Sequence, residues 1–171
     1  MLWTNRIFCG MIKDSVYLRD RQMRNLGGIK SMRKVVKFGG SSLASAEQFK
    51  KVGDIIRADK GRKYVVPSAP GKRFDGDIKV TDMLYACYAK AEKKEDITAS
   101  IAAIRERYME IINGLGLSLS LDDQFEVISE NFKKLAGSNY AASRGEYLNG
   151  IIMANYLGYE FIDAAEVIVF H

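Results

Sequence analysis

From residue 33 onward, short apolar runs alternate with longer amphipathic stretches. The β-branched run 33–38 ends at Gly39-Gly40, which predicts a buried strand entering a turn. A second run, 64–66, is closed by Pro67 and predicts the next strand. Helical stretches follow both runs. This strand–helix–strand–helix order predicts an α/β fold with a parallel-leaning sheet.

Ser45 and Gln48 have the spacing of a capping box, which predicts a helix start. The apolar face of that helix is Phe49, Val52, Ile55 and Ile56. Residues 69–80 are rich in Gly, Lys and Asp and predict a loop, after which Thr81 is expected to cap a helix. That helix carries Met83, Leu84, Cys87 and Tyr88.

Two further helices are predicted by apolar residues at alternating steps of four and three. The first stripe ends before Gly114 and Gly116, and the second before Gly137. The stripes are Ile97, Ile101, Ile104, Tyr108 and Ile111, then Leu121, Phe125, Ile128, Phe132 and Leu135. The helices from about 82 to 137 thus form an insertion between strands. A helix over 139–157 and short strands at Tyr159–Asp163 and Val167–Phe170 complete the pattern.

The composition is that of one globular domain. The chain has 171 residues, of which 47% are hydrophobic and 27% charged. These values exclude a largely disordered chain, a collagen-like repeat and a disulfide scaffold. Two cysteines allow at most one bridge and fit a reducing, cytoplasmic setting. The only histidine, His171, leaves little room for histidine-based metal or nucleophile chemistry.

The net charge of +5 is concentrated at the N-terminus. Residues 1–31 hold six basic and two acidic side chains, whereas the remainder holds twenty and nineteen. A nucleic-acid-binding protein spreads its basic residues over the binding surface, so no nucleic-acid partner is expected. No apolar run approaches membrane-spanning length, so no membrane partner is expected either.

Residues 1–31 are expected to be an N-terminal extension outside the core. Gly27-Gly28 marks a break, and Met32 stands directly before the first predicted strand, as a functional start would. The alternative is an extra helix that docks on the domain or on a partner.

The chemistry-bearing segment is 37–42, where a strand delivers Lys37, then two glycines, then Ser41 and Ser42. Glycines let backbone N–H groups approach a phosphate, and a lysine supplies a point charge for phosphoryl oxygens. The lysine precedes the glycines, so the segment is not a Walker A loop. Taken alone, these residues favour a tight turn beside a solvent-facing lysine over a phosphate site.

Three stretches carry a family resemblance. They are KFGGSSL at 37–43, VVPSAPG at 65–71 with KVTDML at 79–84, and SRGEYLN at 143–149 with YEFIDA at 159–164. In this order they resemble the aspartokinases of the amino acid kinase family, over residues 32–170. The resemblance implies the amino acid kinase (carbamate kinase-like) fold, an α/β sheet sandwiched by helices, of which only the N-terminal portion is present.

The resemblance also implies a reaction and its site. ATP and L-aspartate would give ADP and 4-phospho-L-aspartate, the first step toward lysine, threonine and methionine. Lys37 would neutralise phosphoryl charge as the catalytic residue, with Mg²⁺ bridging the phosphates. Gly39, Gly40 and Ser41 would contact the phosphates. No protein metal ligand is implied.

On the aspartate side, the resemblance assigns Glu146 to the substrate α-ammonium group, while Ser68 and Thr81 would hydrogen-bond near the substrate. A surface glutamate, a strand-end hydroxyl and a plain helix cap are the structural alternatives. Arg144 is not assigned as a ligand, because a solvated arginine is commoner. The combination of Ser68, Thr81 and Glu146 disfavours assignment of the chain to another carboxylate kinase or to a carbamate kinase.

The resemblance further implies that residues 32–171 are the aspartate-binding part of a longer cytoplasmic enzyme. The nucleotide-binding and regulatory regions would follow, and the full-length form could be a homo-oligomer. The isolated chain is therefore expected to be inactive. The alternative is a non-catalytic remnant or an interaction module built on this core.

Overall fold

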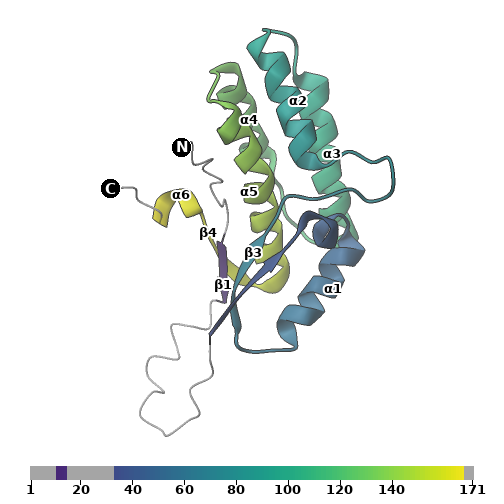
Figure 1. Ribbon diagram of the computed structural model, residues 1–171, viewed down its shortest axis with the longest axis vertical. Coiled ribbons are helices and arrows are strands. Elements are labelled where there is room, and N and C mark those ends of the chain that lie inside the picture. Colours follow the sequence, from purple (N-terminus) through teal and green to yellow (C-terminus); the bar gives the residue numbers. More distant parts are fainter. Residues whose placement is uncertain (1–10, 15–32, 168–171) are drawn as a thin grey trace, which may run out of the picture.

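The computed structural model describes residues 11–14 and 33–167 (Figure 1). The strands are β1 (Met11–Asp14), β2 (Lys34–Phe38), β3 (Arg62–Pro67) and β4 (Tyr159–Ile162). The first helical elements are the 3-10 helix η3 (Gly40–Leu43), α1 (Ala46–Arg57) and α2 (Val80–Glu92). They are followed by α3 (Thr98–Leu115), α4 (Asp122–Lys133), α5 (Ser138–Leu157) and α6 (Ala164–Val167).

The strands form one sheet in the order β2-β3-β1-β4. β2 pairs with β3 in parallel, and β1 is antiparallel to both β3 and β4. Strands β2, β3 and β4 therefore run in the same direction, which confirms the α/β class and the parallel-leaning sheet. Both crossovers, β2 to β3 and β3 to β4, step the same way across the sheet. Right-handed connections then place α1 and α5 on one face, where α5 packs on β3, β1 and β4 (Figure 1).

β1 differs from the expectation that residues 1–31 stand outside the core. Its backbone lies between β3 and β4, with Ile12 opposite Val65 on one side and Phe161 on the other. The rest of the extension lies outside the described residues. A four-residue strand of mixed polarity carries too little pattern to be predicted from sequence.

The first predicted strand is confirmed as β2. Val36 and Phe38 face the helices and pack against the core. Val35 (66% exposed) and Lys37 point to the opposite face, as alternation along a strand requires. The second predicted strand is also confirmed, with Pro67 as its last residue.

The start of α1 is confirmed, since the Ser45 hydroxyl accepts the N–H of Gln48 at 3.4 Å. The predicted cap of α2 is wrong. The backbone N–H of Met83 bonds to the carbonyl of Lys79 at 3.1 Å, so Lys79 is the N-cap and Thr81 lies within the first turn. Val80 is fully buried, and its N–H bonds to the Pro70 carbonyl at 3.1 Å, which fixes the earlier start.

The two apolar stripes form the core between α2, α3, α4 and α5. All but two members are buried: Ile101 is partly buried and Leu135 is 51% exposed. α4 ends at Lys133, earlier than predicted, and Leu135 adopts a φ of 57°. Gly137 therefore does not end α4; at a φ of 101° it is the N-cap of α5.

Near the C-terminus, β4 confirms one short strand. Helix α6 (Ala164–Val167) includes Val167, which was expected to be the first residue of the other strand. Asp163 explains the change, because its carboxylate accepts the N–H of Ala165 at 2.9 Å and so starts a helical turn. The rest of the predicted strand, 168–170, lies outside the described residues. None of the described helices is both long enough and apolar enough to cross a membrane.

Candidate active site

The site begins where two parallel strands end side by side. Phe38 and Pro67 are opposite each other in the β2–β3 ladder, so the loops after them leave from the same edge of the sheet. Lys37, opposite Val66, is exposed one residue before this edge. Ser68 is anchored at the edge itself, since its N–H donates to the Phe38 carbonyl at 3.0 Å.

The two loops touch through their glycines. The N–H of Gly71 donates to the carbonyl oxygen of Gly40 at 2.8 Å. A Cβ on Gly71 would lie 2.6 Å from the carbonyl carbon of Gly40 and 2.8 Å from the nitrogen of Ser41. A Cβ on Gly40 would lie 2.8 Å from the carbonyl oxygen of Ala69. Neither position has room for a side chain, whereas a Cβ on Gly39 would meet open space.

Helix α5 closes one side of these loops through Asn149. This residue is fully buried, and its Nδ2 donates to the carbonyl oxygen of Ser68 at 2.6 Å. The other polar atom of the amide, Oδ1, is buried without a hydrogen-bond partner. Asn149 lies one helical turn after Glu146, so both residues share one side of α5.

Gly145 lets α5 approach the loop and α2 closely. A Cβ at this position would lie 2.7 Å from the Cβ of Ala69 and 3.8 Å from the Oγ1 of Thr81. Glu146 is the next residue and is half-buried. The structure therefore brings the backbone of Ser68 and the hydroxyl of Thr81 to the turn of α5 that carries Glu146, although the three residues are far apart in sequence.

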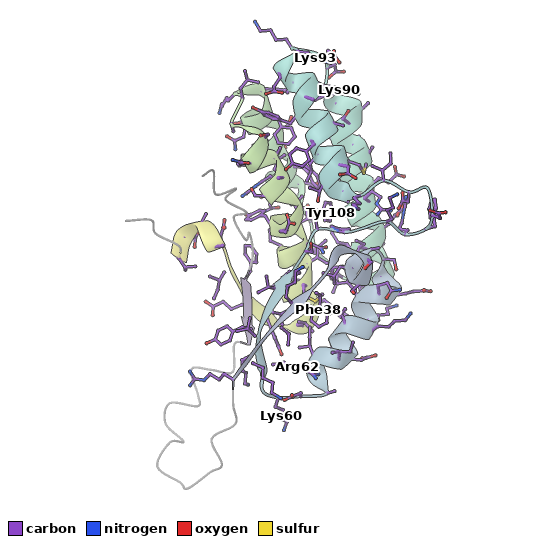
Figure 2. All side chains as sticks on the ribbon, viewed as in Figure 1. Phe38, Lys60, Arg62, Lys90, Lys93 and Tyr108 are labelled. Atoms are coloured by element: carbon purple, nitrogen blue, oxygen red, sulfur yellow. The ribbon has the colours of Figure 1, made fainter. Side chains whose placement is uncertain are left out.

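Tyr108 of α3 supports the same turn from within the core. Its hydroxyl donates to the carbonyl oxygen of Gly145 at 2.8 Å, and its side chain is fully buried (Figure 2). Burial raises the pKa of Tyr108 well above its usual value, and the charge of Glu146 raises it further. The phenol thus stays neutral and keeps its proton for the hydrogen bond.

Sequence reasoning missed Arg107, which is 5% exposed on α3. One terminal nitrogen donates to the carbonyl oxygen of Gly71 at 2.9 Å, and the other contacts an Asp77 carboxylate oxygen at 3.0 Å. Its position, one residue before Tyr108 in a buried stripe, was the signal available in the sequence. Asn149 was inside the SRGEYLN motif but had no assigned role.

Asp77 is held in the loop before α2 by two arginines. Besides Arg107, Arg73 binds it with its backbone N–H and with Nε, both at 2.9 Å, and reaches Glu110 of α3 at 2.6 Å. Burial acts to raise the pKa of Asp77, but hydrogen bonds from Arg73 outweigh it and the pKa is lowered. Asp77 therefore stays charged at neutral pH and holds the loop to α3.

Arg144 is committed to packing. Its guanidinium group lies 4.6 Å from the ring centres of both Tyr140 and Tyr147, and its Nε donates to the Ser143 hydroxyl at 3.2 Å. Among the described residues, no group of three His, Cys, Asp or Glu side chains is placed to hold a metal ion.

Lys90 and Lys93 project from the far end of α2, away from the strand ends, so they lie outside the candidate site (Figure 2).

Comparison with known proteins gives a consistent family. The pattern of the amino acid kinase family matches residues 32–171. Aspartokinase 3 of Bacillus subtilis (strain 168) is 39% identical over 142 residues, covering 78% of this chain and 31% of its own length. The crystal structure of Clostridium acetobutylicum aspartate kinase superposes with a TM-score of 0.70 at 48% identity, covering 72% of this chain and 29% of that one.

A more distant structure, E. coli aspartokinase III in complex with aspartate and ADP, shares the fold with a TM-score of 0.51 at 24% identity. It covers 72% of this chain and 28% of its own. The chain thus spans less than a third of the length of each of these relatives. Because the family pattern covers residues 32–171, most of the chain, the chain belongs to the amino acid kinase family.

Proposed function

We propose that this chain is the aspartate-binding part of an aspartokinase, which converts ATP and L-aspartate to ADP and 4-phospho-L-aspartate. The observation that carries the proposal is the convergence of Ser68, Thr81 and Glu146 on one turn of α5, beside the Gly40–Gly71 contact. A carboxyl-phosphorylating enzyme needs both features together: a place for an amino acid and a backbone cradle for phosphoryl oxygens.

On the amino acid side, Glu146 would accept a charge-assisted hydrogen bond from the α-ammonium group of aspartate. The same carboxylate would repel a substrate bound with its carboxylate reversed. Ser68 and Thr81, which lie near the turn of α5 that carries Glu146, would orient the substrate through their hydroxyl groups. Because Asn149 and Tyr108 fix the backbone beneath them, this half of the site is held rigidly.

On the phosphate side, Lys37 would neutralise charge on the transferred phosphoryl group, and Gly39, Gly40 and Ser41 would present backbone N–H groups. The substrate carboxylate is already a nucleophile, so alignment and charge neutralisation are the main requirements. Mg²⁺ belongs to the proposal only as the cation carried by the nucleotide phosphates. The described residues supply no cage for it.

The activity would need groups beyond this chain, since the matched part spans less than a third of the length of each relative. We place the nucleotide-binding and regulatory parts in that remaining length, together with any contacts that form a homo-oligomer. The domain assignment of residues 32–171 rests on the same comparison. The product would enter lysine, threonine and methionine synthesis in the cytoplasm.

The test is an acyl-phosphate assay in which hydroxylamine traps the product. It compares the 171-residue chain with a protein extended to the length of the relatives. We expect no turnover from the short chain, because in-line positioning alone is worth effective molarities of about 10⁵–10⁸ M. The extended protein should turn over aspartate, and Lys37→Ala should lower kcat by roughly 100-fold or more.

Two variants sharpen the result. Lys34→Ala is the matched control, because Lys34 lies on the same strand but pairs with Asp59 at 2.7 Å, away from the strand end. Glu146→Gln should raise the KM for aspartate about 10- to 100-fold, since hydrogen bonds to charged groups are worth about 1.5–3 kcal/mol. Lys37-dependent turnover by the short chain would refute the incomplete-site proposal. An extended protein without aspartate-dependent turnover would favour an interaction module.

A further inference from the structure

We propose that Arg107 is a positioning residue that holds the phosphate-side loop in place through Gly71. The inference rests on the proposed function for its kinetic consequence but not for its structural one. Arg107 is remote from the glycine loop in sequence, and its two terminal nitrogens bind Asp77 and the Gly71 carbonyl. Its influence on the site would be exerted through the backbone.

The connection runs in two steps. Arg107 donates to the carbonyl oxygen of Gly71 at 2.9 Å, and the N–H of the same residue donates to the carbonyl oxygen of Gly40 at 2.8 Å. The Cα of Gly71 lies between these two bonds, and it is so close to the other loop that a Cβ on it would lie 2.8 Å from the nitrogen of Ser41. A shift of Gly71 would therefore move Gly40 and Ser41, the groups proposed to receive phosphoryl oxygens.

The guanidinium geometry suits this task better than a lysine would. Arg107 reaches Gly71 with one terminal nitrogen and Asp77 with the other, as a planar fork allows. A lysine side chain is shorter and ends in one nitrogen instead of two, so we expect its ammonium group to favour the charged Asp77 carboxylate over the Gly71 carbonyl. Arg107→Lys thus keeps the charge beside Asp77 and loses the link to Gly71.

The ion pairs that Arg73 makes around Asp77 explain why the guanidinium group of Arg107 stays in place. Arg73 binds Asp77 from the other side and also pairs with Glu110, which lies one turn after Arg107 on α3. Both ends of the loop segment 71–77 are thereby fastened to the same helix. Because Arg107 is 5% exposed, water competes little for these bonds.

Ser68 has anchors of its own in Asn149 and in the Phe38 carbonyl. Loss of the Arg107 link should therefore disturb the phosphate side of the site more than the aspartate side. This asymmetry separates a positioning role from general support of the fold, which would lower the amount of active protein and leave both KM values unchanged.

The test uses Arg107→Lys with Arg105→Lys as the matched control. Arg105 lies on the same helix, is exposed and pairs with Asp122 of α4. In the extended protein, Arg107→Lys should raise the KM for ATP at least tenfold and change the KM for aspartate less than threefold. In the 171-residue chain, the same change should speed amide exchange at Gly71 at least tenfold, with the amide of Phe49 as the internal reference. Arg105→Lys should change none of these.

The proposal is overturned if Arg107→Lys leaves amide exchange at Gly71 unchanged. It is equally overturned if Arg107→Lys leaves the KM for ATP unchanged. If Arg107→Lys does not fold, Asp77→Asn decides: it removes one anchor of the fork and should raise the KM for ATP about threefold, whereas no change counts against the proposal. Failure of the proposed function is recognised separately, because the unsubstituted extended protein would then show no aspartate-dependent turnover. The exchange measurement would still decide whether Arg107 holds the loop.

Discussion

The N–H of Gly71 donates to the carbonyl oxygen of Gly40 at 2.8 Å, which joins the loop after β3 to the loop after β2. The two backbones are so close that each excludes a Cβ on the other. Neither glycine has a positive φ, so the backbone conformation does not demand glycine at these positions. Glycine is required because there is no space for a Cβ. The contact fixes the shape of the candidate phosphate cradle before any ligand arrives.

This contact predicts a contrast between neighbouring glycines. Gly71→Ala should lower the free energy of unfolding by about 1–3 kcal/mol, because the new methyl group would overpack the backbone of Gly40 and Ser41. Gly39→Ala should change it by no more than about 0.5 kcal/mol, since the space there is open and φ is −78°. Urea titration of both variants checks the prediction. Equal losses would mean that the loops do not approach as closely as the structure shows.

Asn149 should matter to stability as well as to the site. Asn149→Ala removes the 2.6 Å bond to the Ser68 carbonyl and leaves that oxygen without its side-chain partner. We expect a loss of about 1–3 kcal/mol by thermal or urea unfolding. Asn155→Ala, on the exposed side of the same helix, is the control and should have a much smaller effect. If the two variants unfold alike, the buried bond is not formed in solution.

Cys87 should resist alkylation in the folded chain. Burial raises the pKa of its thiol from 9.0 to about 11, so at pH 8 almost none of it is the reactive thiolate. In a Cys9→Ser background, iodoacetamide should label Cys87 only when urea unfolds the protein. Rapid labelling without denaturant would show that the packing around Cys87 on α2 opens in the folded protein.

The same shift predicts a stability change at high pH. Between about pH 9 and 11 the unfolded thiol ionises while the buried one keeps its proton, so the unfolded state is favoured as pH rises. Stability conferred by the protonated thiol is complete below pH 9 and is lost toward pH 11. Cys87→Ala should remove this part of the pH dependence, and the part that Tyr108 contributes in the same direction should remain.

β1 gives a direct test of the N-terminal extension. A chain starting at Met32 loses the ladders to β3 and β4, so its melting temperature should fall by roughly 5–15 °C, corresponding to about 2–4 kcal/mol. Ile12→Pro should cause a similar fall in the intact chain, because proline removes a ladder donor in a central strand. An unchanged melting temperature in both variants would show that β1 does not stabilise the core, as the sequence had predicted for residues 1–31.

Most of the helices and strands could be predicted, because helix caps and apolar stripes depend on residues close together in the sequence. The Ser45 cap and the 4–3 stripes of α3 and α4 depend on neighbours within a turn or two, and both are confirmed. The start of α2 was misjudged because its first turn is set by a bond from Val80 to Pro70 and by burial of Val80, neither of which is visible as a capping motif. The end of α4 failed for a similar reason, since Leu135 accepts a positive φ that sequence reasoning reserves for glycine.

The residues of the candidate site came from the family resemblance, and their support was not predictable. Arg107 and Asn149 act on backbone carbonyls of Gly71 and Ser68, and such partners leave no trace in the sequence of either side. Charge and burial must be known together before a buried arginine in a helix stripe can be distinguished from a solvated one. Only the tertiary arrangement supplies that information.

The position of β1 has a consequence for folding. β1 and β4 are the first and last described strands along the chain, yet they are neighbours in the sheet, and the pairing of Ile12 with Phe161 closes a loop of nearly the whole described length. Contacts between such distant residues carry a large loop-closure entropy and slow the search for the native state. The helices α2 to α5, rich in local contacts, should form early. The β1–β4 ladder should be among the last parts of the molecule to assemble and the first to open.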